Sequence, residues 1–211
     1  MSNFSIKNII FDFDGVIIDS MSIRADGVRE VFCNYDKNLV EEFVEYYKYN
    51  AGLSKFSKIK YFYNSILKKN ISEEKVNEYS DQLSKIMKKK LILKEVLIKD
   101  TVDFIKCNYK KYNMSIASGS EEKELNYLCE QLEIKKYFRG IYGAPLHKND
   151  IVKNIIKNNN YNLEETILIG DSINDFDAAK VNNIGFYGFN NESLKNKSDI
   201  YIDSYDIFED I

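Results

Sequence analysis

Residues 8–20 read NIIFDFDGVIIDS, an apolar run interrupted by two carboxylates. The apolar residues at 9–11 have the length and β-branched content of a buried strand, with Asp12 and Asp14 at its carboxyl end. If the alternation of the strand continued, both acids would point to the same side. Like charges this close are costly unless a cation or a bound proton offsets them. A simple turn at Gly15 is the plainer alternative, so the rest of the chain has to decide.

The composition limits the classes of protein to consider. The chain has 211 residues, 44% hydrophobic and 30% charged, which suits one globular core, alone or with a smaller inserted domain. The formal net charge of −3 gives no electrostatic case for nucleic acid as a partner. No apolar run could cross a bilayer, and the first residues, MSNFSIK, do not resemble a signal peptide. We therefore expect no membrane partner and a cytoplasmic location.

Cysteine and histidine are too few for the metal sites that these residues commonly form. Cys33, Cys107 and Cys129 are odd in number and widely spaced, which suits neither a disulfide framework nor a zinc site. We expect them to be buried, unreactive thiols. The single histidine, His147, excludes a two-histidine metal cluster.

The hydrophobic pattern divides the chain into a helical stretch and an alternating one. Up to about residue 90, apolar residues recur at three- and four-residue spacing, which is typical of helices. From residue 99, helices alternate with short apolar strands, which favours a parallel sheet covered by helices on both faces. The expected helices are 19–34, 38–49, 55–70, 73–90, 99–111, 120–132, 149–158 and 174–181. The expected strands after the first are 113–117, 140–143, 166–170, 184–188 and 199–202.

Polar residues follow the ends of several expected strands, where a parallel sheet binds its ligands. They are Asp12, Asp14, Ser118, Gly119, Ser120, Lys148, Asp171 and Asp175. Clustered carboxylates suit Mg²⁺. A lysine, a hydroxyl and the free N–H groups of a helix start, expected at residue 120, suit a phosphate. Together these groups predict a phosphoryl-transfer site.

Four stretches of the chain, in this order, resemble the motifs of the haloacid dehalogenase (HAD) superfamily of phosphohydrolases. They are DFDGVIIDS (12–20), IASGS (116–120), GAPLHK (143–148) and GDSINDFDAA (170–179). The resemblance is closest to β-phosphoglucomutase-like and phosphoglycolate-phosphatase-like members. It implies an α/β fold with a parallel, Rossmann-like sheet over residues 1–19 and 91–211, and an inserted all-α cap over residues 20–90.

The resemblance assigns roles to the acids. Asp12 would be the nucleophile that forms an aspartyl-phosphate. Asp14 would be the general acid for the leaving alcohol and then the general base for water. Mg²⁺ would be held by the Asp12 carboxylate, the Asp14 backbone carbonyl and Asp171. Asp175 would support these ligands, with direct ligation as the alternative.

The resemblance also indicates how the substrate would be held. Ser118 and Lys148 would hold the transferring phosphoryl oxygens, and Lys148 would also neutralise Asp12. Gly15 would let the chain turn, so that the Asp14 side chain can reach the leaving oxygen. Further substrate contacts are expected from Gly119 and Ser120.

A short segment of the cap, residues 52–55, resembles the loop that carries a basic residue toward the substrate in relatives. Lys55 is the candidate, with Ser54 and Lys58 behind it. The plain alternative is a helix start capped by Ser54. The segment 50–64 also resembles HAD hydrolases associated with surface-polysaccharide biosynthesis, which suggests a phosphorylated sugar or sugar-linked alcohol.

A phosphatase is the favoured function, and its partner would be a small-molecule phosphate ester. The related mutases carry a histidine four residues after the hydroxyl of the first motif, where this chain has Arg24 after Ser20. They also place an acid where it has Gly170. A phospho-aspartate receiver domain of signalling proteins is an alternative from another class, but the D-x-D spacing and the helical insertion weigh against it. We expect a monomer, with a dimer as the alternative.

Overall fold

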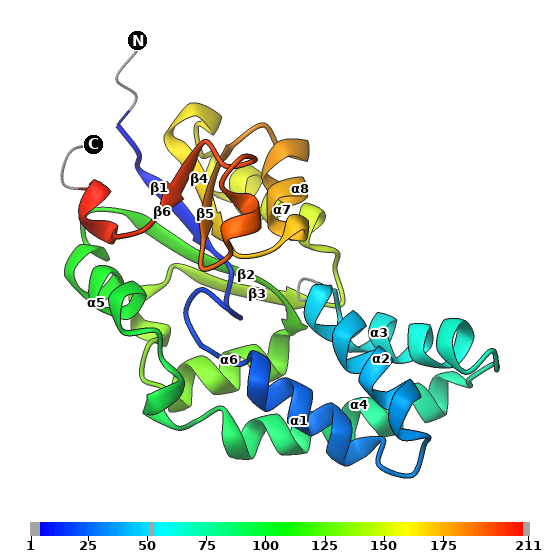
Figure 1. Cartoon of the computed structure of the whole chain (residues 1–211). Coiled ribbons are helices and arrows are strands. Elements are labelled where there is room, and N and C mark those ends of the chain that lie inside the picture. Colours follow the sequence, from blue (N-terminus) through cyan, green and yellow to red (C-terminus); the bar gives the residue numbers. More distant parts are fainter. Residues whose placement is uncertain (1–4, 51–52, 209–211) are drawn as a thin grey trace.

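A six-stranded parallel sheet forms the centre of the part of the chain that the structure describes (Figure 1). The structure is a computed structural model and describes residues 5–50 and 53–208. The strands are β1 Asn8–Phe11, β2 Asn113–Glu121, β3 Gly140–Ala144, β4 Thr166–Gly170, β5 Gly185–Phe189 and β6 Ile200–Ile202. Their order is β3-β2-β1-β4-β5-β6, which is that of a Rossmann-like sheet, as predicted.

The central strand β1 fixes where the polar residues meet. All four of its residues are buried, and Phe11 pairs in register with Ile116 of β2 and Ile169 of β4. Because parallel strands end at the same edge, the residues that follow β1, β2 and β4 lie close to one another. That edge is the place predicted for the site.

Helices cover both faces of the sheet. They are α5 Lys99–Asn108, α6 Glu122–Gln131, α7 Lys148–Asn159 and α8 Ile173–Val181. Side chains of α5 and α6 share an apolar cluster with Ile9 and Phe11 of β1, whereas α7 and α8 pack with Ile10. Successive residues of a strand point to opposite faces, so each pair of helices covers one face. The predicted fold class is confirmed.

Residues between β1 and α5 form a group of helices beside the sheet (Figure 1). They are α1 Met21–Val31, α2 Lys37–Tyr49, α3 Lys55–Tyr61, a π-helical turn Phe62–Ile66 and α4 Glu73–Lys90. Their buried side chains form a separate apolar cluster. At its centre, the ring of Phe62 lies 4.7 Å from that of Phe43 and 4.9 Å from that of Phe32. These helices therefore stabilise one another largely through their own core.

One predicted helix in this group is too long. The helix expected over 55–70 ends at Tyr61 and widens into the π-helical turn, where the Leu67 N–H donates to the Phe62 carbonyl at 2.9 Å. Lys68, with φ 54°, then adopts a left-handed conformation and ends the helical path. Apart from β2, the other predicted boundaries differ by at most three residues. None of the described helices combines the length and apolar character needed to cross a membrane.

The prediction of buried cysteines is correct only for Cys129. Burial raises the pKa of its thiol to about 12. Cys33 and Cys107 are exposed, because they lie near helix ends that face away from the apolar clusters.

Candidate active site

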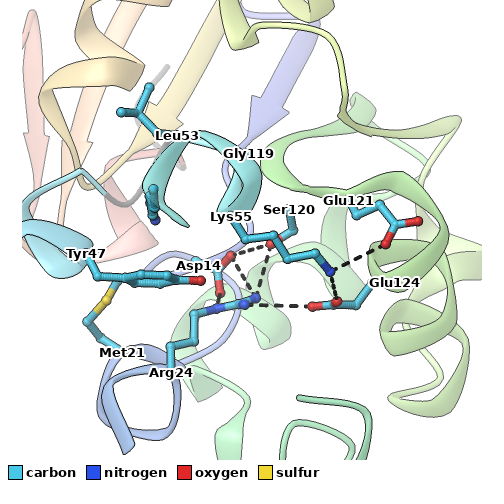
Figure 2. A pocket seen from close by; sticks show the side chains of 11 residues that line it. Asp14, Met21, Arg24, Tyr47, Leu53, Lys55, Gly119, Ser120, Glu121 and Glu124 are labelled. Atoms are coloured by element: carbon cyan, nitrogen blue, oxygen red, sulfur yellow. Dashed lines mark hydrogen bonds and ion pairs between the residues drawn. The ribbon is translucent and has the colours of Figure 1, made fainter. Parts of the chain in front are cut away.

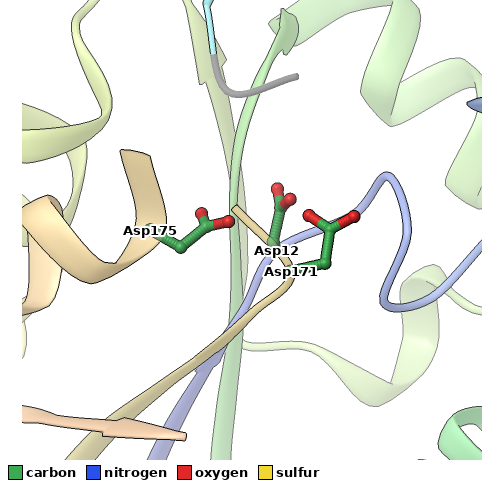
Figure 3. Close-up of side chains that lie close together, drawn as sticks. All are labelled: Asp12, Asp171 and Asp175. Atoms are coloured by element: carbon green, nitrogen blue, oxygen red, sulfur yellow. The ribbon is translucent and has the colours of Figure 1, made fainter. Parts of the chain in front are cut away.

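Three carboxylates meet at the predicted edge of the sheet (Figure 3). Asp12 follows β1, Asp171 follows β4, and Asp175 lies in the first turn of α8. One carboxylate oxygen from each lies within 4.8 Å of the others. Asp12 is 3% exposed and Asp175 is fully buried. The structure thus brings together three of the four acids predicted to form a metal site.

The electrostatics of this cluster fit a divalent cation. Burial, and then the charge of Asp175, raises the pKa of Asp12 to about 7. Burial and the charge of Asp12 raise the pKa of Asp171 well above its ordinary value. One oxygen of Asp171, Oδ1, is buried and has no hydrogen-bond partner among the described residues. Mg²⁺ prefers oxygen ligands, and its charge would offset the repulsion among these carboxylates.

The backbone at Gly15 packs directly against this cluster. Gly15 has φ 82°, and a Cβ atom there would lie 1.9 Å from Oδ2 of Asp171. Any other residue would displace that carboxylate. Two amides after β5 hold the same loops: Asn190 donates to the Gly15 carbonyl at 3.1 Å, and Asn191 donates to the Asp171 carbonyl at 2.7 Å. No motif or periodic pattern indicates the role of these two asparagines.

Lys148 is a buried part of the site. Its Nζ lies 2.7 Å from Oδ1 of Asp12 and 2.5 Å from Oδ1 of Asp175. It is only 3% exposed, and although burial alone would lower its pKa, the two acids raise it. It is the first residue of α7, whose N-cap is His147. A surface lysine is therefore excluded, and the amine sits beside the predicted nucleophile.

Both oxygens of Asp175 already accept hydrogen bonds. Oδ1 accepts from Lys148, and Oδ2 accepts from the backbone N–H of Ser172 at 3.0 Å and its hydroxyl at 2.6 Å. The pair forms a capping box at the start of α8. This geometry favours a supporting position beside the ligands Asp12 and Asp171 over direct ligation.

Ser118, Gly119 and Ser120 do not open a helix, contrary to the sequence prediction. β2 runs on to Glu121 because that residue pairs with Ala144 of β3, after a register shift that begins at Ala117. The helix expected at 120 begins at Glu122. Ser118 is buried, and its hydroxyl accepts from the Ser120 N–H at 3.0 Å. The turn at 118–120 therefore offers a hydroxyl at the sheet edge but no helix N-terminus.

Asp14 is not one of the three clustered carboxylates, and its side chain has partners of its own (Figure 2). Arg24 of α1 donates from Nε to Oδ1 at 2.6 Å and from Nη2 to Oδ2 at 3.1 Å. The hydroxyls of Ser20 and Ser120 donate to it as well. Burial alone would raise the pKa of Asp14, but the guanidinium and these hydrogen bonds lower it. In this arrangement, Asp14 is held as a carboxylate.

A small cavity of about 20 Å³ lies beside Asp14 and Arg24. Its lining combines buried cations from the helices between β1 and α5 with acids from outside those helices. The lining residues are Asp14, Met21, Arg24, Tyr47, Leu53, Lys55, Lys58, Gly119, Ser120, Glu121 and Glu124. The cavity therefore adjoins Asp14, the residue predicted to act first as general acid and then as general base.

The predicted cap residues have two different environments. Ser54 is the N-cap of α3, where its hydroxyl accepts from the Ser57 N–H, which is the plain alternative considered from the sequence. Lys55 reaches the cavity: its Nζ lies 2.8 Å from Glu124 Oε2 and 3.4 Å from Glu121 Oε2. Gly52, the first residue of that predicted loop, lies outside the described residues.

Sequence reasoning missed the functional position of Arg24 and Glu124. In the sequence, Arg24 stands out only because it occupies the position of the mutase histidine. Glu124 is 2% exposed and falls on the same face of α6 as Leu125 and Leu128. A charged residue within that apolar stripe was the available signal, because such a residue is rarely buried without a partner.

The chain matches known proteins over most of its length. A model of the family described as haloacid dehalogenase-like hydrolase matches residues 9–189. Among curated proteins, none matches significantly. Among solved structures, a β-phosphoglucomutase from Clostridium difficile has 20% identity and a TM-score of 0.80, over 97% of this chain and 96% of that chain.

Two further structures extend the comparison. A protein described as a predicted phosphoglycolate phosphatase from Haemophilus somnus has 15% identity and a TM-score of 0.75, over 97% of each chain. A HAD-type hydrolase from Bacillus subtilis, bound to magnesium, has 13% identity and a TM-score of 0.73, over 98% of each chain. At these identities the structural likeness shows a shared fold and no more.

Proposed function

Because the chain belongs to the family of haloacid dehalogenase-like hydrolases, we propose that it is a Mg²⁺-dependent phosphatase acting on a small phosphate monoester through an aspartyl-phosphate on Asp12. The observation that carries this proposal is the Lys148 ammonium 2.7 Å from Asp12, next to Asp171. A nearby positive charge favours the ionised, nucleophilic form of a buried carboxylate. The same charge can bind phosphoryl oxygens.

Asp12, Asp171 and the backbone carbonyl of Asp14 would hold Mg²⁺, with Asp175 in support. The raised pKa values of Asp12 and Asp171 and the partnerless oxygen of Asp171 support this ligand set. When bound, the ion would neutralise the clustered acids and offset the charge on the phosphoryl oxygens.

The residues of the chain would divide two displacement steps between them. A carboxylate oxygen of Asp12 attacks phosphorus, and the bond to the alcohol oxygen breaks as Asp14 gives that oxygen a proton. Asp14 then takes a proton from water, which attacks the same phosphorus, releases phosphate and restores Asp12. Lys148 and Ser118 hold the phosphoryl oxygens during both steps. Beside Arg24 the Asp14 carboxyl is ionised, so before the first step it has to turn away from the guanidinium and take up a proton from solvent.

We further propose that residues 20–90 are a cap domain and that residues 1–19 and 91–211 are the catalytic core. The separate apolar cluster of α1–α4 supports this division. So does the cavity beside Asp14, to which both parts contribute residues. The cap would close over the leaving group, exclude water and test the body of the substrate.

The substrate we propose is a phosphorylated sugar or sugar-linked alcohol, on the resemblance of residues 50–64 to hydrolases of surface-polysaccharide biosynthesis, and the protein would act in the cytoplasm. A phosphosugar mutase of the same family is the second candidate. The replacement of the mutase histidine by Arg24, which is bonded to Asp14, favours the phosphatase. The six-stranded sheet and the matched family model leave a signalling receiver domain disfavoured.

Replacing the nucleophile tests the proposal. Asp12→Asn should reduce phosphate release from a generic aryl phosphate by at least about 10³-fold, because Asp175, the other described carboxylate bonded to Lys148, already accepts hydrogen bonds with both of its oxygens. Asp177→Asn, on the exposed side of α8, is the matched control and should retain wild-type turnover. Circular dichroism confirms that both variants fold. Turnover by Asp12→Asn at the wild-type rate would contradict the assignment.

A further inference from the structure

The cavity beside Asp14 has an unusual composition. Three cationic side chains reach it from the helices between β1 and α5: Arg24 is 7% exposed, Lys55 is 8% exposed and Lys58 is 3% exposed. Buried cations are costly unless each has an anion nearby. The anions available among the lining residues are Asp14, Glu124 and the more exposed Glu121.

The acids of the core are shared unequally among these cations. Lys55 takes the shortest contact with Glu124, at 2.8 Å, and a longer one with Glu121. Arg24 lies 3.8 Å from Glu124, so its main partner is Asp14. Lys58 lies with its Nζ 3.9 Å from the centre of the Tyr47 ring. The charge of Arg24 therefore depends on Asp14 for its compensation.

The proposed reaction removes that compensation. If Asp14 turns to the leaving oxygen of the substrate, the Nε–H and Nη2–H groups of Arg24 lose the two carboxylate oxygens that accept from them and keep only the neutral hydroxyl oxygens of Ser20 and Ser120. These two donors form a planar fork that matches a carboxylate or a phosphoryl group. A neutral hydroxyl on the substrate could accept from one of the two donors but would not compensate the charge of Arg24.

The small size of the cavity limits how far from the ester oxygen of the substrate such an anion could lie. A volume of about 20 Å³ holds about one water molecule, because a single water needs roughly 10–15 Å³. A large leaving group cannot enter while Arg24 keeps its place against Asp14. A small anionic group close to the ester oxygen would take the position that the Asp14 carboxylate now occupies on the fork.

We propose that Arg24 is a specificity-determining residue that recognises a second anionic group, a carboxylate or a phosphoryl group, on the leaving group within a few bonds of the ester oxygen. This inference rests on the proposed phosphatase function. It narrows the substrate class from phosphate esters in general to those whose alcohol carries its own negative charge.

Three small esters test this inference by binding. They are 2-hydroxyethyl phosphate, which has a neutral leaving group, 2-phosphoglycolate, which adds a carboxylate, and ethylene glycol bisphosphate, which adds a phosphoryl group. Calorimetric titration with Mg²⁺ would use the Asp12→Asn protein, alone and combined with Arg24→Gln. We expect at least one anionic ester to bind about tenfold or more tightly than the neutral one, the size expected for one charged hydrogen-bonded pair. The better of the two identifies the anion.

The effect of Arg24→Gln decides the assignment. Arg24→Gln should lower the ratio of the Kd of the neutral ester to the Kd of the anionic ester by about tenfold. The control is Lys60→Gln, which should leave this ratio unchanged, because Lys60 of α3 pairs with Glu73 at the surface. Equal Kd values for all three esters, no binding at millimolar concentration, or a ratio unchanged by Arg24→Gln would each overturn the inference. If Arg24→Gln does not fold, Arg24→Lys replaces it, because lysine keeps the charge and lacks the planar pair of donors. The same ratio of Kd values is then measured. If the wild-type protein hydrolyses none of the three esters, that result counts against the proposed function and leaves the binding test to decide the role of Arg24.

Discussion

Two aspartates that are two positions apart have opposite environments. The carboxylates of Asp171 and Asp175 lie beside Asp12, and burial together with the charge of Asp175 raises the pKa of Asp12 to about 7. Asp14 faces a guanidinium and two hydroxyls, which lower its pKa. Acids whose environments differ in this way can take different roles in one reaction. In the described state the shifts are the reverse of those that a nucleophile and an acid need. The proposed roles therefore require a cation beside Asp12, which would lower its pKa, and a movement of Asp14 away from Arg24, which would raise the pKa of Asp14.

Lys58 gives a test of the electrostatics at the scale of a single residue. Burial, and then the charge of Arg24, lowers the pKa of Lys58 to about 7. Between about pH 7 and the ordinary lysine value of 10.5, the unfolded chain binds a proton that the folded chain does not. The free energy of unfolding therefore rises with pH across this window through Lys58. Below pH 7, the contribution of the buried charge is fully unfavourable.

Lys58→Met should remove this contribution. We expect the variant to be more stable than wild-type protein at pH 6.5 by on the order of a few kcal/mol, and the difference to shrink toward pH 10. Urea denaturation of both proteins at several pH values measures it, and Lys60→Met serves as the control because that lysine is partly exposed. A stability difference that does not change with pH would contradict the lowered pKa.

The sequence allowed the residues of the sheet edge to be predicted, but not their partners. Asp12, Lys148 and Asp171 are where the motifs placed them, because each follows directly from a strand end or a helix start. Arg24 pairs with an acid ten residues away, and Glu124 pairs with Lys55 at a separation of 69 residues. Such pairs depend on how helices pack on the core, which local patterns do not encode.

At the scale of elements, Glu124 of α6 joins three helices to the core. It accepts from Lys55 of α3 at 2.8 Å and from Ser84 of α4 at 2.7 Å, and it lies 3.8 Å from Arg24 of α1. Burial alone would raise its pKa, but Arg24 and Lys55 outweigh burial and lower it. Glu124 is therefore ionised at neutral pH and holds α1, α3 and α4 against α6.

Glu124→Gln should loosen these helices. Removing one partner of a buried ion pair leaves the others uncompensated, at a cost of about 3–5 kcal/mol. We expect lower stability in urea and faster amide hydrogen exchange in α3 and α4 than in β1 and β4. Glu130→Gln, on the exposed side of the same helix and paired with Lys135, is the control. Equal exchange in α3 for wild type and Glu124→Gln would show that this residue does not hold the helices in place.

The elements that were predicted least well are those set by tertiary pairing. β2 extends four residues beyond its predicted end because Glu121 pairs with Ala144. The helical segment 55–70 is interrupted by a π-helical turn. In contrast, α4 matches its predicted bounds, 73–90, because Ser72 supplies a capping hydroxyl to the Lys75 N–H. Local capping chemistry can be read from a sequence, whereas strand extension requires a neighbour.

At the scale of the whole molecule, the parallel sheet concentrates negative charge at one edge. Asp12, Asp171 and Asp175 come from segments far apart in the sequence, and within the described residues Lys148 is the cation bonded to two of them. Their mutual repulsion opposes folding, because the unfolded chain separates them. A divalent cation that binds only the folded site should therefore stabilise the fold as a whole.

Mg²⁺ should raise the unfolding temperature of the metal-free protein. At a concentration about 100-fold above its Kd, a ligand that binds only the folded state adds about 2.7 kcal/mol to the free energy of unfolding. Because protons compete for carboxylates whose pKa values are raised, the gain should be larger at pH 8 than at pH 5.5.

Thermal unfolding with EDTA and then with excess Mg²⁺, at both pH values, measures this gain. Asp171→Asn should abolish it, since it removes a proposed ligand whose Oδ1 has no other partner, whereas Asp177→Asn should keep it in full. Asp171→Asn should also be the more stable of the two in EDTA, because it relieves the repulsion within the cluster. An equal response to Mg²⁺ in both variants would mean that the ion binds elsewhere, and the acidic edge of the sheet would then need another source of positive charge.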